Sequence, residues 1–135
     1  MASIRKQIPI HAAADAVWEA VRDFGAVHER LVPGFVVDCR LEGDERIVTF
    51  ASGTVQREPL VALDDGARRL VYTAADSPLG MTHYNASLQV FADGAKTSRV
   101  EWIVDVLPSE LAPRLDAAMD GGAAAMQRAL GSFDA

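Results

Sequence analysis

The spacing of hydrophobic residues divides the chain into a helical end and a long extended region. Between residues 108 and 133, apolar side chains recur at intervals of four and seven, which is typical of one face of an α-helix. These residues are Leu111, Leu115, Met119, Met126 and Leu130. Because no other segment is long enough for a substantial helix, the pattern predicts one long helix at the C-terminal end.

From residue 35 to residue 107 the period shortens to two and turn residues separate the segments, which indicates half-buried strands. The predicted strands cover residues 35–41, 46–51, 54–63, 68–75, 81–91 and 97–107. An earlier strand at residues 3–10 is expected at a sheet edge, because Pro9 cannot donate to a ladder. Two short helices, residues 13–24 and 26–31, follow it. This order predicts one α+β domain over residues 1–135, in which a curved antiparallel sheet of about seven strands wraps around the long helix.

Alternation along each strand predicts which side chains face the long helix. The pattern is clearest in the last two strands, where apolar residues oppose polar ones at every second position. The predicted inward residues are Phe35, Val37, Cys39, Val48, Phe50, Leu70, Tyr72, Ala74, Tyr84, Ala86, Leu88, Val90, Val100, Trp102, Val104 and Val106.

The strand that starts at Thr54 does not resolve in this way, because both of its faces carry polar groups. Either Arg57 lies inside, or Gln56 and Glu58 do. A carboxylate that faces a half-dry interior is costly without partners, which would make Glu58 a candidate functional residue. The alternative is that Glu58 pairs with an arginine on the solvent side.

Small residues occupy the middle of the long helix's apolar face, at Gly121, Gly122 and the three alanines that follow. Interior glycines cost roughly 1 kcal/mol each relative to alanine, so they need a reason. We interpret the gap as room for a ligand in a cavity that the helix covers. The alternative is that the glycines let the helix approach the sheet closely.

Composition and charge limit the kinds of partner and cofactor that we expect. The net charge of −6 argues against nucleic acid or an anionic membrane as a partner. No segment resembles a secretion signal or a membrane span, so we expect a cytoplasmic protein. Its expected assembly is a monomer or a homodimer. The histidines His11, His28 and His83 are scattered, and the single cysteine, Cys39, lacks an activating neighbour. We therefore predict no metal and no cofactor.

The element order resembles the START/birch-pollen-allergen-like superfamily, also called SRPBCC or helix-grip proteins. More narrowly, similarity to bacterial polyketide cyclase/dehydrase-like proteins, and more distantly to plant abscisic-acid receptors, lies in the phrases VWEAVRDFGAVHERLVPGFVVDCRLEG, VTFASGTVQREPLVALDDGARRLVYT, HYNASLQV and VEWIVDVLP. The resemblance covers essentially the whole chain. It implies a helix-grip fold and a small hydrophobic ligand, but not which ligand, because members bind lipids, sterols, hormones, polyketides and flavonoids.

The resemblance also implies roles for particular residues. In similar receptors the glutamate of the E-x-L phrase faces the cavity, which here would turn Glu58 inward together with Gln56. Tyr84 matches an inward tyrosine of the family. The receptors' cavity lysine falls on Val37 and their gate shrinks to a Ser-Gly turn, so abscisic acid itself is not expected. The pocket should favour a neutral apolar ligand with one or two polar handles.

Two hypotheses of function follow. The first is a binding or carrier protein that holds an aromatic, polyketide-like or lipid-like molecule between the sheet and the long helix. The second is a cyclase or dehydratase that uses Glu58 and Tyr84 as acid and base groups, and a protein-interaction role without a ligand is a third reading. The predicted ligand-binding residues are Val37, Phe50, Gln56, Glu58, Tyr72, Tyr84, Ala86, Trp102, Met119, Gly122 and Met126.

Overall fold

The computed structural model describes residues 1–75 and 77–132 and has the predicted α+β architecture. The strands are β1 (Ala2–Ile10), β2 (Val36–Glu42), β3 (Glu45–Phe50), β4 (Val55–Asp64), β5 (Arg69–Thr73), β6 (His83–Gly94) and β7 (Thr97–Leu107). The helical segments are α1 (Ala14–Arg22), η1 (Phe24–Ala26), η2 (Val27–Leu31), η3 (Ser109–Leu111) and α2 (Ala112–Leu130). Each predicted strand is present with slightly shifted ends, and the predicted helix end at Phe133 lies outside the described residues.

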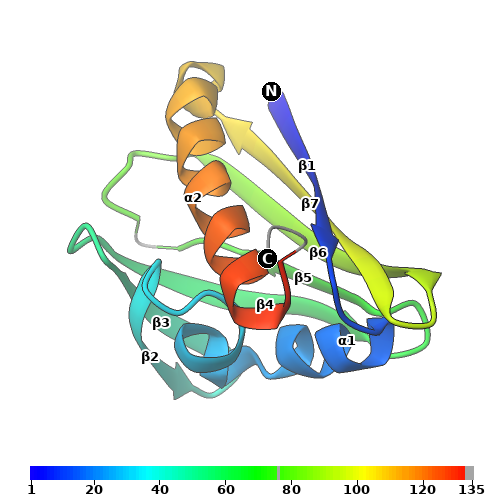
Figure 1. Cartoon of the computed structure of the whole chain (residues 1–135). Helices are drawn as coiled ribbons and strands as arrows, with labels where there is room; N and C mark the ends of the chain where they lie inside the picture. Colours follow the sequence, from blue (N-terminus) through cyan, green and yellow to red (C-terminus); the bar gives the residue numbers. More distant parts are fainter. Residues whose placement is uncertain (76, 133–135) are drawn as a thin grey trace.

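All seven strands form one antiparallel sheet in the order β1-β7-β6-β5-β4-β3-β2. The first strand therefore pairs with the last, with Ile4 opposite Val104, and β1 and β2 are the two edges. The sheet curves, and α2 crosses its concave side, as Figure 1 shows. The segments α1, η1 and η2 connect the two edge strands across one end of the sheet.

The position of α2 is set by contacts to the edge strand β1. Lys6 Nζ lies 2.7 Å from Asp116 Oδ1 and 2.8 Å from Asp120 Oδ1. Near the other end of the helix, Gln127 Nε2 donates to the Pro9 carbonyl at 3.0 Å. These contacts hold α2 along β1 and leave its inner face over the middle of the sheet. In the part of the chain described, no helix combines the length and apolar character that a membrane crossing needs.

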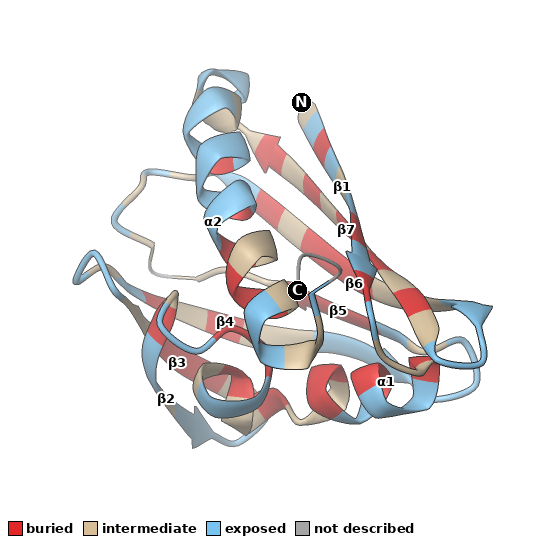
Figure 2. Ribbon diagram, viewed as in Figure 1, coloured by how far each residue is buried: buried red, intermediate tan, exposed pale blue. Residues whose placement is uncertain are grey.

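The hydrophobic core lies between the concave side of the sheet and the helices. Figure 2 shows the alternation along β7, where every second residue is buried. Each residue predicted to face inward from β6 and β7 is buried, which confirms the two-residue pattern there: Tyr84, Ala86, Leu88, Val90, Val100, Trp102, Val104 and Val106.

The prediction that Val37 faces the interior is wrong. β2 contains a bulge, in which Val36 and Asp38 pair with successive residues of β3 and Val37 has no partner. An extra residue moves a side chain to the other side of the sheet. Accordingly Val37 is 54% exposed, whereas Val36 is buried. The predicted ligand contact of Val37 is therefore not present in the described structure.

Candidate functional site

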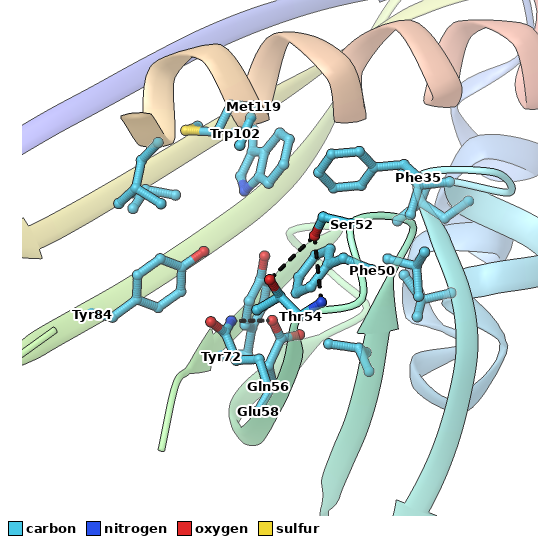
Figure 3. Close-up of a pocket in the computed structure, with 18 of the residues that line it drawn as sticks. Phe35, Phe50, Ser52, Thr54, Gln56, Glu58, Tyr72, Tyr84, Trp102 and Met119 are labelled. Atoms are coloured by element: carbon cyan, nitrogen blue, oxygen red, sulfur yellow. Dashed lines mark hydrogen bonds between the residues drawn. The ribbon is translucent and has the colours of Figure 1, made fainter. Parts of the chain in front are cut away.

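A cavity of about 360 Å³ lies between α2 and the concave side of the sheet (Figure 3). Its volume falls in the range typical of small-molecule sites. Its polar wall residues are Arg46, Ser52, Thr54, Gln56, Glu58 and Arg114. The rest of the wall is apolar or aromatic: Val27, Leu31, Val32, Phe35, Val36, Val48, Phe50, Ala51, Tyr72, Leu79, Tyr84, Leu88, Trp102, Val104, Leu115, Ala118, Met119 and Met126.

Most of the residues predicted to bind a ligand line this cavity. They are Phe50, Gln56, Glu58, Tyr72, Tyr84, Trp102, Met119 and Met126. Ala86 is fully buried but does not reach the cavity, and its ladder neighbours Tyr72 and Val104 form the wall at that level. Val37 points outward from the bulge. Ligand contact by the wall residues remains a prediction.

The interpretation of the glycine gap in α2 as ligand space is wrong. A Cβ added at Gly122 would lie 2.9 Å from the Trp102 ring and 3.3 Å from the Phe35 ring. Gly122 therefore lets two aromatic rings pack against the helix backbone, while Gly121 is exposed. The structure thus agrees with the alternative interpretation, in which the glycines let the helix approach the sheet closely. Figure 3 shows Trp102 and Phe35 directly beneath α2, and we call α2 together with these two rings the roof of the cavity.

A polar cluster of Arg46, Gln56 and Glu58 forms the opposite side of the cavity, which we call the floor. The exposed fractions of these residues are 4%, 4% and 3%. Arg46 Nε donates to Glu58 Oε1 at 2.7 Å, and Gln56 Nε2 donates to Glu58 Oε2 at 2.7 Å. Both oxygens of the carboxylate thus accept hydrogen bonds and its charge is paired, as a buried carboxylate requires.

The floor resolves the orientation of β4 that the sequence left open. Gln56 and Glu58 face inward, whereas Arg57 lies on the other side and donates to Glu45 at 2.9 Å. Arg46 was missed as a site residue, although it has the same parity as the inward residues Val48 and Phe50. It also lies directly opposite Glu58 in the ladder between β3 and β4. The alternation and this pairing together could have identified it.

The guanidinium of Arg46 is enclosed by aromatic rings as well as by its acid partner. Its central carbon lies 4.2 Å from the centre of the Phe24 ring and 4.7 Å from that of Tyr72. Burial alone would lower the pKa of Arg46, but the adjacent Glu58 carboxylate outweighs it and the pKa is raised. Arg46 therefore stays charged and pairs with Glu58 across the floor.

Two tyrosines stand between floor and roof. Burial raises the pKa of Tyr72 to about 12, and the Glu58 carboxylate acts in the same direction. Burial also raises the pKa of Tyr84 well above the usual 10, with Tyr72 and Glu58 adding to the effect. Both hydroxyls are therefore neutral at physiological pH and can donate hydrogen bonds.

The cavity reaches the surface where its wall residues are exposed, at Ala51, Ser52, Arg114 and Ala118. This mouth lies between the turn from β3 to β4 and the first half of α2. The predicted Ser-Gly turn is thus one rim of the mouth. Arg114 gives the rim a positive charge, although the chain as a whole is acidic.

The other candidate groups lie away from the cavity wall. His11 and His83 are exposed, and the half-buried Cys39 packs beside the core. Burial raises the pKa of the Cys39 thiol, which makes it less reactive. Within residues 1–75 and 77–132, no three His, Cys, Asp or Glu side chains come together as a metal site would require.

A family model described as "Polyketide cyclase / dehydrase and lipid transport" matches residues 1–135. The chain belongs to this family. The match spans every element of the fold and therefore all residues of the cavity wall, the floor and the roof. A comparison with curated proteins gives no match.

Solved structures share this family member's fold over nearly its whole length. A protein from Thermobifida fusca is 32% identical, with a TM-score of 0.75 over 91% of this chain and 85% of its own. An uncharacterized protein from Bacillus thuringiensis is 23% identical, with a TM-score of 0.85 over 95% and 98% of the two chains. A START superfamily protein from Mycobacterium smegmatis is 12% identical, with a TM-score of 0.78 over 94% and 96%. The predicted START-like, helix-grip fold is therefore confirmed.

Proposed function

We propose that the protein binds or carries a small, largely apolar molecule in the cavity between α2 and the sheet. The observation that carries this proposal is the cavity of about 360 Å³, whose walls are mainly aliphatic and aromatic. Its polar groups are concentrated at the floor and the mouth, where they can orient a ligand. Burial of apolar surface would supply most of the affinity, at roughly 25 cal/mol per Å² before the costs of binding. The lipid-transport part of the family description supports the same role.

The family description also includes cyclases and dehydrases, so the alternative function is that of a cyclase or dehydratase. The geometry of the floor speaks against acid–base catalysis by Glu58 and Tyr84. Each oxygen of Glu58 already accepts a hydrogen bond from Arg46 or Gln56, so proton abstraction would have to break a buried ion pair. A phenol with the raised pKa of Tyr84 is in turn a weak proton donor. Binding is the function that this arrangement favours.

A fluorescent probe tests the proposal directly. N-Phenyl-1-naphthylamine is neutral, aromatic and almost dark in water, and its emission rises in an apolar site. We expect saturable binding with one probe per chain, and native mass spectrometry of the freshly purified protein should show a displaceable small molecule or uptake of the probe. A titration that does not saturate, with no adduct in the mass spectrum, would contradict a binding function.

Two neighbouring alanines of α2 provide a matched control. Ala117 and Ala118 are both exposed, but only Ala118 is part of the cavity wall. Ala118→Trp should narrow the mouth and weaken probe binding, whereas Ala117→Trp should leave it unchanged. Equal affinities in the two variants would place the binding site elsewhere on the surface.

A further inference from the structure

One hydrogen-bond donor in the cavity wall has no acceptor. Trp102 is 8% exposed, and its Nε1 has no hydrogen-bond partner among the residues described. Two other buried polar atoms share this property, His28 Nδ1 and Ser98 Oγ, but neither residue lines the cavity. Buried donors are almost always satisfied in native proteins, so an unsatisfied one on a cavity wall calls for an explanation.

The other tryptophan of the chain, Trp18, has a hydrogen-bonded indole N–H and serves as a comparison. Trp18 in α1 is buried to a similar degree, with 5% of its surface exposed. Its Nε1 donates to Asp65 Oδ1 at 2.9 Å. Since Trp18 does not line the cavity and Trp102 does, the contrast points to the cavity as the source of the missing acceptor.

The roof fixes the direction of the Trp102 N–H. The ring atoms that Gly122 admits are Cζ3 and Cη2, which a Cβ at that position would approach to 2.9 and 3.0 Å. These atoms form the benzene edge of the indole, on the side opposite Nε1. With this edge under the helix, the nitrogen points away from α2 and into the cavity, as Figure 3 shows.

Other donors face the same space. The hydroxyls of Tyr72 and Tyr84 point towards it from the sheet (Figure 3). Burial raises the pKa of Tyr72 to about 12, and the nearby Trp102 N–H acts weakly in the opposite direction. The geometry between the two groups nevertheless falls short of a hydrogen bond, so Trp102 Nε1 has no partner. The floor donors Arg46 Nε and Gln56 Nε2 are committed to Glu58. The tyrosine hydroxyls can donate or accept and also interact with each other. Among the described wall residues, Trp102 Nε1 is therefore the buried group that can only donate and lacks an acceptor.

We propose that Trp102 determines ligand specificity, by donating a hydrogen bond from its indole N–H to an acceptor oxygen of the bound molecule. The cavity accordingly prefers an aromatic ketone to a hydrocarbon of the same shape. This inference rests on the proposed binding function and adds the functional group that the ligand must carry. A site with a buried donor discriminates against an analogue that cannot accept its hydrogen bond.

Two matched tricyclic probes, 9-fluorenone and fluorene, test this inference, because they differ by a carbonyl in place of a methylene. Displacement of N-phenyl-1-naphthylamine measures their affinities, and ¹H–¹⁵N spectra of the full chain follow its two indole N–H signals. We expect fluorenone to bind about tenfold more tightly. The Trp102 indole proton should move downfield with fluorenone and not with fluorene, while the Trp18 signal stays in place.

Variants separate the hydrogen bond from the shape of the ring. Trp102→Phe should reduce the affinity for fluorenone about tenfold and that for fluorene less than twofold. Trp18→Phe should keep the preference for the ketone, and it also assigns the two indole signals. Should Trp102→Phe fail to fold, the spectra of the unaltered protein decide the question.

The possible failures are distinguishable. Equal affinity for the two probes, without a fluorenone-specific shift of the Trp102 signal, overturns the role of Trp102 and leaves the binding function intact. If neither tricyclic probe nor N-phenyl-1-naphthylamine binds, the proposed function itself is overturned.

Discussion

The roof and the floor of the cavity are built in opposite ways. In the roof, Trp102 and Phe35 pack against the backbone of α2 at Gly122, and the contacts are those of apolar surfaces. In the floor, Arg46 and Glu58 form a buried ion pair whose hydrogen bond is 2.7 Å long. The roof depends on volume and the floor on charge pairing.

This difference separates two contributions to ligand binding. The floor has committed the Glu58 carboxylate and the donors Arg46 Nε and Gln56 Nε2 to one another, so it can orient a ligand only as a fixed dipolar surface. The roof retains an unpaired donor at Trp102. We therefore expect changes in the floor to act mainly on stability, and changes in the roof to act on both stability and specificity.

The largest effect is expected from breaking the floor. Arg46→Met leaves the Glu58 carboxylate buried without its counter-charge, which should lower the free energy of unfolding by about 3–5 kcal/mol. Urea denaturation measures the loss. As a control, Arg30→Met removes an exposed pair with Asp23, 2.9 Å long with side chains 44% and 43% exposed, and should cost no more than about 1 kcal/mol.

A second variant tests why Arg46 matters. In the double variant Arg46→Met/Glu58→Leu no charge is left buried, so part of the lost stability should return. If the double variant is less stable than Arg46→Met alone, packing around the guanidinium and not charge pairing explains the effect. That result would remove the contrast between floor and roof.

The tyrosines between floor and roof give a prediction for alkaline pH. Tyr72 and Tyr84 are the chain's two tyrosines, and both pKa values are raised above 10 by burial. Absorbance at 295 nm should therefore show no tyrosinate near pH 10 in the folded protein, but a full transition there in urea. Release of both protons near pH 10 in the folded state would show that the two rings are open to water.

The sign of the accompanying stability change follows from linkage. Below pH 10 both states keep their tyrosine protons, so these groups contribute no pH dependence. Between pH 10 and about 12 the unfolded chain loses protons that folded Tyr72 retains, so stability falls as pH rises. Because the pKa of Tyr72 is about 12 in the folded protein and about 10 in the unfolded chain, the free energy of unfolding should fall by roughly 3 kcal/mol across this range.

The roof and the floor also differ in how far the sequence predicts them. Strict alternation in β7 predicted Trp102 as inward because both faces of that strand are clearly marked. Alternation also pointed to Arg46, but the prediction passed over a charged residue whose partner stands on the next strand. The outward turn of Val37 comes from a bulge, which is visible in the ladder between β2 and β3 and not in the spacing of apolar residues.

The role of Gly122 was beyond sequence reasoning for a different reason. The gap of small residues in α2 was visible, but its filling depends on where the helix crosses the sheet. Phe35 comes from the segment before β2, and Trp102 comes from the middle of β7. Neither lies on α2, so the helical spacing alone cannot show that their rings meet Gly122. Small residues on one face of a helix predict a gap at that position. They do not predict which side chain of another element fills the gap.

Enlarging Gly122 should disturb the roof. The side chain of Gly122→Leu would collide with the Trp102 and Phe35 rings, and we expect a loss of about 1–3 kcal/mol from overpacking. Ala129→Leu, at an exposed position of the same helix, should change stability little. Displacement of Trp102 should also weaken binding of N-phenyl-1-naphthylamine. Unchanged stability and binding would mean that the rings do not pack on this glycine.

The smallest effect compares two adjacent glycines of α2. Gly121→Ala should stabilise the protein by about 0.5–1 kcal/mol, because alanine favours the helix and its Cβ meets Phe35 at an ordinary 3.5 Å. Gly122→Ala gains the same helix propensity, but its Cβ would lie 2.9 Å from a Trp102 ring atom, so the ring must move and the gain should vanish. The midpoint of urea denaturation resolves such a difference. Equal gains at both positions would mean that Trp102 has room beneath the helix, and its N–H would then not be held towards the cavity by Gly122.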